Sequence, residues 1–339
     1  MKPNDFAKYL TDFMIKYLTE ERGCSVNTVN AYRDTIVLLL IYFKEQTGIA
    51  ADKLTFKDIT KERIISYLEW LEKQRNCCPS TRNARLAAIH AFFRFLQYRS
   101  PEQMEEWQKI ITIKIKRTSK PQVHYLTQEG IKLLLSQPDP QTKKGMRDLI
   151  MLSTMIEGGT RVQEIADLTP SKVHFGEPTV LSVTGKGNKT RIVPFSKQAS
   201  ELLKKYMQIN HLLEPYANDY PLFGNGRRGK MSRMGISAIV RKYANKARVV
   251  SPKLIPVGIT PHSLRHSKAM LMMKSGINLI CIRDFLGHQS VSSTEIYARI
   301  DNQQKLDAIN KTSLTPDTGK LPSWQRDKGL LHWLEHLGK

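Results

Sequence analysis

The chain has 339 residues, which is too long for one ordinary hydrophobic core, so we expect two domains. Hydrophobic residues make up 40% and charged residues 25%, an ordinary globular composition, and the longest apolar run, 36–43, is too short to span a membrane. Lysine and arginine total 53 against 31 acidic residues, and the net charge of +22 favours nucleic acid as the partner over an anionic membrane or an acidic protein.

Two further features indicate the compartment. Residues 1–5 lack the apolar segment of a signal peptide. The cysteines have no metal-ligand spacing, and an adjacent pair rarely forms a disulfide, so reduced thiols are expected. We therefore expect a cytoplasmic protein, whose cysteines are Cys24, Cys77, Cys78 and Cys281.

The first part of the chain, 5–100, predicts a small all-α domain. Apolar residues recur there at helical spacing, and one helix is expected over 26–46 because Gly48 can end it. Thr60 is a candidate N-cap for the next helix, and Pro79 stands near the start of another. Together with a helix at the start, they make four helices that can share one core.

Polar residues of this domain, to which we assign 1–111, are candidates for DNA contacts. Arginine and asparagine side chains donate hydrogen bonds to phosphates and base edges. A solvated helix face explains any one of them equally well. The candidates are Asn27, Asn30, Arg33, Arg82, Asn83 and Arg85.

A basic segment, 112–124, separates this domain from the next. Its residues alternate up to Pro121 and do not follow a helical period. An extended basic linker can track a phosphate backbone, and an ordinary exposed connector is the alternative. Its candidate DNA contacts are Lys114, Lys116 and Arg117.

A larger, mainly helical domain is expected over 125–315. One interruption predicts a β-hairpin, with strands at 180–183 and 191–193 and a turn at 185–188 rich in residues that tolerate positive φ. The basic tip can insert a charge into DNA, or it is a solvated turn. The tip residues are Lys186, Lys189 and Arg191.

The first candidate site in this domain is Arg161. Gly159 and Thr160 precede it, and Glu164 follows three residues later. On a helix that spacing places Arg161 and Glu164 on one face. A surface ion pair is the simplest explanation of this pair by itself.

The second candidate site is a helix start at Thr260. Thr260 is a good N-cap, Pro261 suits the first helical position, and His262 and Arg265 then lie on one face. A histidine and an arginine at a helix N-terminus can hold a phosphate. A capped helix with incidental polar residues is the alternative, and His266 is better explained as structural.

The third candidate site is Tyr297. His288 lies shortly before it, and Ser292 and Glu295 have capping-box spacing, so Tyr297 is expected early on a helix. A lone tyrosine on a helix is usually a core or interface residue.

Taken together, these motifs resemble the tyrosine recombinase (phage integrase) family. The resemblance covers about 125–312, the all-α region matches the family's core-binding domain, and only Thr160 is a small variation. It implies a mainly α fold with a small β-hairpin or sheet, in which an all-α SAM-like core-binding domain precedes a mixed α/β catalytic domain. The motif residues, in family order, are Arg161, Lys186, His262, Arg265, His288 and Tyr297.

The resemblance also implies the role of each residue. Tyr297 would attack the phosphorus and form a 3′-phosphotyrosyl link, with His262 as general base and Lys186 as general acid for the 5′ oxygen. Arg161 and Arg265 would clamp the phosphate oxygens. His288 would donate a hydrogen bond to the phosphate, and Glu164 would orient its neighbours. No cofactor and no metal are expected.

The segment after residue 315 is assigned to a tail, 316–339. It contains a His-x-x-Glu-His pattern, 332–336, which also occurs in zinc proteases. No room follows it for a further ligand, so an apolar docking helix is the better interpretation. By the resemblance, this tail would contact another protomer of a dimer to tetramer on DNA.

The expected function is therefore site-specific cleavage and rejoining of double-stranded DNA, for integration, excision or transposition of a mobile element. An accessory recombinase or a DNA-bending protein is a possible further partner. Two alternatives stay open from the sequence. One is DNA relaxation like that of a type IB topoisomerase, and the other is a DNA-binding accessory protein without catalytic activity.

Overall fold

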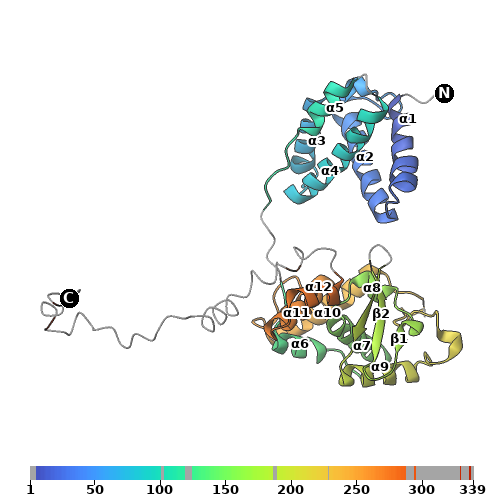
Figure 1. Cartoon of the computed structure of the whole chain (residues 1–339), viewed down its shortest axis with the longest axis vertical. Coiled ribbons are helices and arrows are strands. Elements are labelled where there is room, and N and C mark those ends of the chain that lie inside the picture. The colour runs from blue at the N-terminus through green and yellow to red at the C-terminus, as the bar shows by residue number, and fades with distance from the viewer. Residues whose placement is uncertain are drawn as a thin grey trace. The chain divides into compact units, whose positions relative to one another are not determined.

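The computed structural model describes residues 5–100, 103–118, 124–185, 189–227 and 229–287, together with residues 294, 329 and 336. The chain divides into two compact units, 1–121 and 122–339 (Figure 1). Among the described residues, no helix has the length and apolarity needed to cross a membrane.

The N-terminal unit is all-helical, and its helices begin and end at residues whose chemistry accounts for the boundary. The Ser25 hydroxyl accepts a hydrogen bond from the third helical N–H, and Gly48 ends the same helix at φ 71°. Thr60 caps the next helix, and Pro79 opens the one after it, as predicted. The elements are α1 (Asp5–Thr11), π-helix η1 (Asp12–Glu21), α2 (Val26–Thr47), η2 (Phe56–Asp58), α3 (Lys61–Lys73), α4 (Pro79–Arg99) and α5 (Met104–Ile111).

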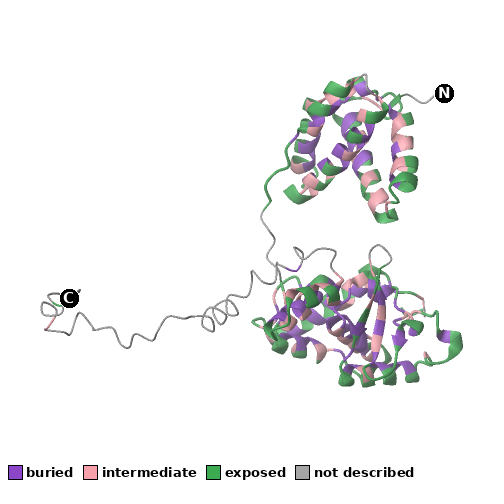
Figure 2. Cartoon of the chain, viewed as in Figure 1, coloured by how far each residue is buried: buried purple, intermediate pink, exposed green. Residues whose placement is uncertain are grey.

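Helix α5 was not predicted, and the core of the unit explains why it forms. Trp107 and Ile110 of α5 are fully buried. The Trp107 ring lies 5.1 Å from the rings of both Phe56 and Phe93. An eight-residue helix is unstable alone, and burial of an aromatic side chain supplies roughly 2–3 kcal/mol to hold it. Figure 2 shows the buried residues on the inner sides of these helices.

The second unit surrounds a small antiparallel sheet with helices (Figure 1). The strand order is β1-β2-β3. The hairpin is confirmed, and the short strand β1 in front of it was not predicted. The elements are α6 (Gln128–Leu135), α7 (Lys143–Glu157), α8 (Val162–Ala166), η4 (Pro170–Lys172), β1 (Val173–His174), β2 (Val180–Thr184), β3 (Thr190–Pro194), α9 (Lys197–Ile209), η5 (Pro215–Ala217), α10 (Arg233–Val250), α11 (Pro261–Lys274) and α12 (Leu279–Leu286).

The hairpin register decides which side chains point into this unit. Val183 pairs with Arg191, and Leu181 pairs with Val193. Leu181, Val183 and Val193 are all buried. Opposite residues of an antiparallel pair share a face of the sheet, so the Arg191 side chain leaves β3 on the buried face.

Candidate active site

Arg161 is held at the junction of α7 and α8. The chain turns at Gly159 with φ 52°, and a β-carbon there would come within 2.7 Å of the Leu286 side chain, so the position strongly favours glycine. Arg161 is then the N-cap residue of α8. Its backbone N–H donates to Glu164 Oε2 at 2.8 Å, and its Nη1 donates to Glu164 Oε1 at 2.8 Å. A third of the Arg161 side chain stays exposed, so it can still meet a ligand.

Glu164 is the buried carboxylate of the site, with a side chain 3% exposed. Arg191 Nη1 donates to Oε1 at 2.9 Å and Nη2 donates to Oε2 at 2.7 Å, a bidentate pair. Burial by itself would raise the pKa of Glu164, but the hydrogen bonds and charge of Arg191, with those of Arg161, lower it below its ordinary value. Glu164 is therefore an anion shared by two guanidinium groups, rather than half of a surface ion pair.

The helix start at Thr260 forms as the sequence predicts. The Thr260 hydroxyl accepts from Ser263 N, and Pro261 occupies the first turn of α11. His262 on that turn is exposed, whereas Arg265, one turn on, is 1% exposed. Arg265 Nη1 donates to the carbonyl of Gly159 at 2.7 Å, which ties α11 to the turn that precedes Arg161.

The pKa values of the two histidines of α11 both lie below the ordinary value for histidine. Partial desolvation, followed by the charges of Arg265 and Arg161, lowers the pKa of His262. Desolvation, His262 and Arg265 lower the pKa of His266 to about 4. The rings of His262 and His266 lie 4.2 Å apart, edge to face. A neutral imidazole at His262 can accept a proton, as a general base must.

The end of α12 brings the arginines of this unit together. The last carbonyls of a helix lack intrahelical partners and carry its negative dipole end. Here guanidinium groups from three elements donate to successive carbonyls at that end, and Gly287 closes the helix at φ 65°. The pairs are Arg191 Nε to Phe285 O at 3.0 Å, Arg265 Nη2 to Leu286 O at 2.6 Å and Arg161 Nη2 to Gly287 O at 2.9 Å.

The convergence of these arginines on the end of α12 was not predicted, although the sequence contained a signal for Arg191. The alternation of the strand predicted over 191–193 places Arg191 on the same face as Val193, an apolar residue that the structure buries. We had predicted that Arg191 contacts DNA. The structure corrects this, because its side chain is 11% exposed and its described hydrogen bonds go to Glu164 and Phe285.

Three of the predicted catalytic residues, Lys186, His288 and Tyr297, lie outside the described residues. Their chain neighbours are described for two of them. Gly185 precedes Lys186, and a β-carbon on Gly185 would lie 3.1 Å from Glu164 Oε1 and 3.4 Å from Arg161 Nη1. Gly287 precedes His288 and accepts from Arg161. Both glycines therefore lie at the arginine–carboxylate cluster.

The predicted DNA contacts of the N-terminal unit fall into two groups. Arg82 is buried and donates to the carbonyl of Lys114, and the half-buried Arg85 donates to the carbonyl of Ala31, so these two act within the fold. We therefore withdraw the predicted DNA contact of Arg82. The other predicted DNA contacts are accessible to solvent, although Asn30 is half-buried. The exposed ones are Asn27, Arg33, Lys114, Lys116 and Arg117, together with Lys189 of the second unit.

The basic linker is partly fixed on its own unit. Asn83 Nδ2 donates to the carbonyl of Lys116 at 2.8 Å, and the backbone N–H of Lys116 donates back to Asn83 Oδ1 at 3.0 Å. Lys116 Nζ lies 2.6 Å from Glu72 Oε2. The predicted contact of Lys116 with DNA therefore competes with an ion pair, whereas no such bond is described for Lys114 or Arg117.

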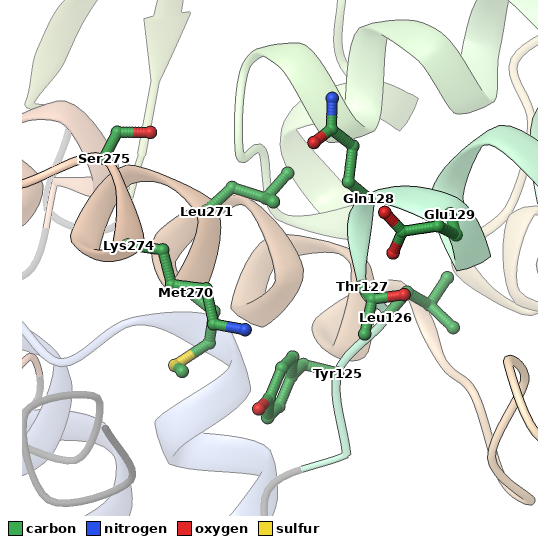
Figure 3. Close-up of a pocket in the computed structure, with 9 residues that line it drawn as sticks. All are labelled: Tyr125, Leu126, Thr127, Gln128, Glu129, Met270, Leu271, Lys274 and Ser275. Carbon is green, nitrogen blue, oxygen red and sulfur yellow. The ribbon is translucent and has the colours of Figure 1, made fainter. Parts of the chain in front are cut away.

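A pocket of about 280 Å³ lies elsewhere in the second unit (Figure 3). Tyr125, the start of α6 and the end of α11 line it, and Glu129 and Lys274 give it mixed charge. None of its lining residues belongs to the arginine cluster. Among the described residues, no group of histidine, cysteine and acidic side chains is arranged to hold a metal ion.

Comparison with protein families places both units. The model of the phage integrase family matches residues 124–304, and that of the phage integrase N-terminal SAM-like domain matches residues 11–100. A putative integrase/recombinase of Sinorhizobium fredii, y4rC, is 33% identical over 337 residues, which is 99% of this chain and 99% of that protein. The tyrosine recombinase XerC of Oceanobacillus iheyensis is 30% identical over 312 residues, 91% of this chain and 97% of XerC.

Solved structures share the fold at lower identity. The Tn1549 transposon integrase in complex with transposon right end DNA has a TM-score of 0.69 at 14% identity and covers 89% of this chain and 99% of its own. The XerH recombinase in its post-cleavage complex has a TM-score of 0.65 at 22% identity, and the match covers 88% of this chain and 84% of the XerH chain. By family match and by full-length relatives, this chain belongs to the phage integrase family and is a tyrosine-type site-specific recombinase.

Proposed function

We propose that the protein cleaves and rejoins double-stranded DNA at specific sites through a 3′-phosphotyrosyl intermediate, and that it serves the integration, excision or transposition of a mobile element. The convergence of Arg161 and Arg265 on adjacent carbonyls at the end of α12 carries the proposal. It gathers cationic groups from distant parts of the sequence beside His262. The similar XerH and Tn1549 integrase structures were solved with DNA, which supports DNA as the substrate.

The chemistry explains why two arginines are needed. A phosphodiester is already an anion, and attack at phosphorus places more charge on its non-bridging oxygens. Fixed cationic donors that meet this developing charge lower the barrier because they need no reorganisation. In the proposal, Arg161 and Arg265 supply these donors. Arg161 is held by the Gly287 carbonyl with a third of its side chain exposed. Arg265 is 1% exposed and bonded to the Gly159 and Leu286 carbonyls, so in the proposal it leaves one of them to bind the phosphate.

The remaining steps are assigned to residues as follows. The Tyr297 oxygen forms a bond to phosphorus while the 5′ oxygen of the DNA leaves; His262 accepts the phenolic proton, and Lys186 donates a proton to the leaving oxygen. His288 donates a hydrogen bond to the scissile phosphate. In the second step, the 5′-hydroxyl of a partner duplex gives its proton to the now neutral Lys186, and its oxygen forms a bond to phosphorus. The bond from phosphorus to the Tyr297 oxygen breaks, and the leaving phenolate takes the proton back from His262. Atoms and charge balance without a metal or a cofactor.

We assign DNA binding to both domains and the linker, with the core-binding domain at 1–111, the linker at 112–124 and the catalytic domain at 125–315. Exposure supports the assignment for Asn27, Arg33, Lys114, Lys116 and Arg117, and for Lys189 of the hairpin. Asn30 and Arg85 are half-buried candidates, and Arg85 also donates to the carbonyl of Ala31.

We further propose that the protein acts as a dimer to tetramer on DNA and that the tail, 316–339, contacts a neighbouring protomer. A λ integrase dimer of similar fold was solved on a core site, which supports the oligomer. Truncation before Pro316 should leave binding of one site intact and impair the pairing of two sites. Unchanged pairing by the truncated protein would refute the role of the tail.

The function is tested with a nicked suicide DNA substrate, on which the covalent intermediate accumulates. Wild-type protein should leave a protein–DNA adduct on a denaturing gel, and Tyr297→Phe should leave none. Absence of the wild-type adduct on its own recombination site would point to a non-catalytic DNA-binding protein. A relaxation assay beside a two-site recombination assay separates strand exchange from topoisomerase-like activity.

A further inference from the structure

Arg191 occupies an unusual place for a basic residue of a DNA-binding hairpin. Its side chain is 11% exposed, although the sequence predicted it as one of the basic residues at the hairpin tip. Nη1 and Nη2 donate to the two oxygens of Glu164, and Nε donates to the carbonyl of Phe285. One side chain thus connects strand β3, helix α8 and the end of helix α12.

The local charges show what this connection does for Arg161. The buried carboxylate of Glu164 lies 2.8 Å from Arg161 Nη1. Without a second cation, that carboxylate would offset the positive charge that Arg161 presents to a bound anion. Arg191, at 2.7 Å from the other oxygen, supplies the second cation, so the trio keeps a net charge of one positive unit.

Two glycines show how closely the neighbouring backbone approaches the trio. A β-carbon on Gly185 would lie 3.1 Å from Glu164 Oε1, and one on Gly287 would lie 3.1 Å from Arg191 Cδ. Gly287 also has φ 65°, which disfavours any other residue. The backbone in front of Lys186 and the backbone in front of His288 therefore both lie against the same ion cluster.

We propose that Arg191 is a positioning residue of the recombinase, and this inference rests on the proposed function. Arg191 neutralises Glu164, so that Arg161 stays cationic toward the scissile phosphate. It also fixes the hairpin to the end of α12. Arg191 itself does not touch DNA. It acts through Glu164 and through the Phe285 carbonyl.

The test is a double-mutant cycle of Arg191→Gln and Glu164→Gln, read as single-turnover cleavage of the suicide substrate. Arg191→Gln should cleave about 10- to 100-fold more slowly, the scale seen when a group that orients a metal ligand is lost. Glu164→Gln in the same chain removes the uncompensated charge, so the double variant should cleave faster than Arg191→Gln alone. Arg191→Lys, which keeps the charge without the planar fork, should lie between wild type and Arg191→Gln.

The matched control is Arg283→Gln on α12. Arg283 also pairs with a carboxylate, Asp284, at 2.7 Å, but outside the cluster, and it should cleave as fast as wild type. Equal rates for Arg191→Gln and Arg283→Gln would overturn the proposal, and so would additive losses in the double variant.

A second readout keeps this inference separate from the proposed function. Arg161 and Arg265 lower the pKa of His262, so uncompensated charge on Glu164 should raise it. In an NMR titration without DNA, His262 should titrate at higher pH in Arg191→Gln than in wild type, and the double variant should reverse the change. If wild type forms no adduct, the proposed function fails while this titration still reports on Arg191. An unchanged His262 titration in Arg191→Gln would refute the charge balance, whatever the activity.

Discussion

Both units of the molecule bury arginines, but they bind them to different partners. In unit 1–121, Arg82 and Arg85 donate to carbonyls of the linker and of α2, which joins neighbouring segments of one helical core. In unit 122–339, Arg161, Arg191 and Arg265 converge on the end of α12, and Arg161 and Arg191 also share the Glu164 carboxylate. Arginines that bond to scattered carbonyls therefore have a structural role, whereas arginines that gather at one helix end around one carboxylate mark a candidate site.

Loss of Arg161 should have the largest effect on the cleavage rate. In Arg161→Ala, single-turnover cleavage should fall by about 100- to 1000-fold, because one preorganised donor to the developing charge is removed. DNA affinity should fall much less, since many phosphate contacts remain. Equal losses in cleavage and in the dissociation constant would contradict the proposed role of Arg161.

Loss of Glu164 should reduce stability as well as activity. Glu164→Ala leaves two guanidinium groups beside an empty buried site, and breaking a buried pair in this way costs about 3–5 kcal/mol of unfolding free energy. Urea unfolding of the catalytic unit within the full chain measures it. A change below about 1 kcal/mol would show that the buried carboxylate is not needed to hold the arginines together.

The acid sensitivity of the second unit follows from the same residue. The pKa of Glu164 is lower in the folded protein than its ordinary value. The ionised carboxylate therefore contributes fully to the unfolding free energy above the ordinary pKa. This contribution is lost as the pH falls through the lowered pKa of the folded state. In Glu164→Gln, this pH-dependent part of the unfolding free energy should be absent. Identical acid dependence in wild type and Glu164→Gln would contradict it.

Loss of Arg82, whose bonds indicate a structural role, should affect stability but not DNA binding or cleavage. Arg82→Ala should lower the unfolding free energy by about 1–3 kcal/mol, because a buried hydrogen-bonded group is removed. The salt dependence of DNA binding and the cleavage rate of bound DNA should stay as in wild type. A reduced salt slope would restore Arg82 as a DNA contact.

The pH profile of cleavage tests His262. Because desolvation and the neighbouring arginines lower its pKa, the acid limb of kcat/KM should lie below about pH 6.5. Arg161→Ala should move that limb upward, toward the ordinary value. If His262→Asn keeps the acid limb of the pH profile of kcat/KM, another residue is the general base.

The smallest effects are expected at the exposed linker. Lys114→Gln and Arg117→Gln should each weaken DNA binding a few-fold and reduce the salt slope by about one, without changing the cleavage rate of bound DNA. Unchanged salt slopes in both variants would leave the linker as an ordinary connector.

The sequence predicted local structure best where one residue decides the conformation. Ser-, Thr- and Gly-based boundaries such as Thr60, Gly48 and Thr260 were correct, because capping depends on residues close in sequence. Helix α5 was not predicted, because its eight residues are stabilised by the packing of Trp107 against the rings of Phe56 and Phe93, which are distant in sequence. The roles of Arg82 and Arg191 were misjudged for a related reason: basic residues look alike until tertiary structure decides which are buried.

The proposed mechanism depends on stabilisation of negative charge on the scissile phosphate by Arg161 and Arg265. It is tested most directly with a suicide substrate whose scissile phosphate is replaced by a methylphosphonate, which lacks the ionised oxygen. The cleavage deficit of Arg161→Ala, relative to wild type, should shrink by about tenfold or more on this neutral substrate. The same deficit on both substrates would contradict it.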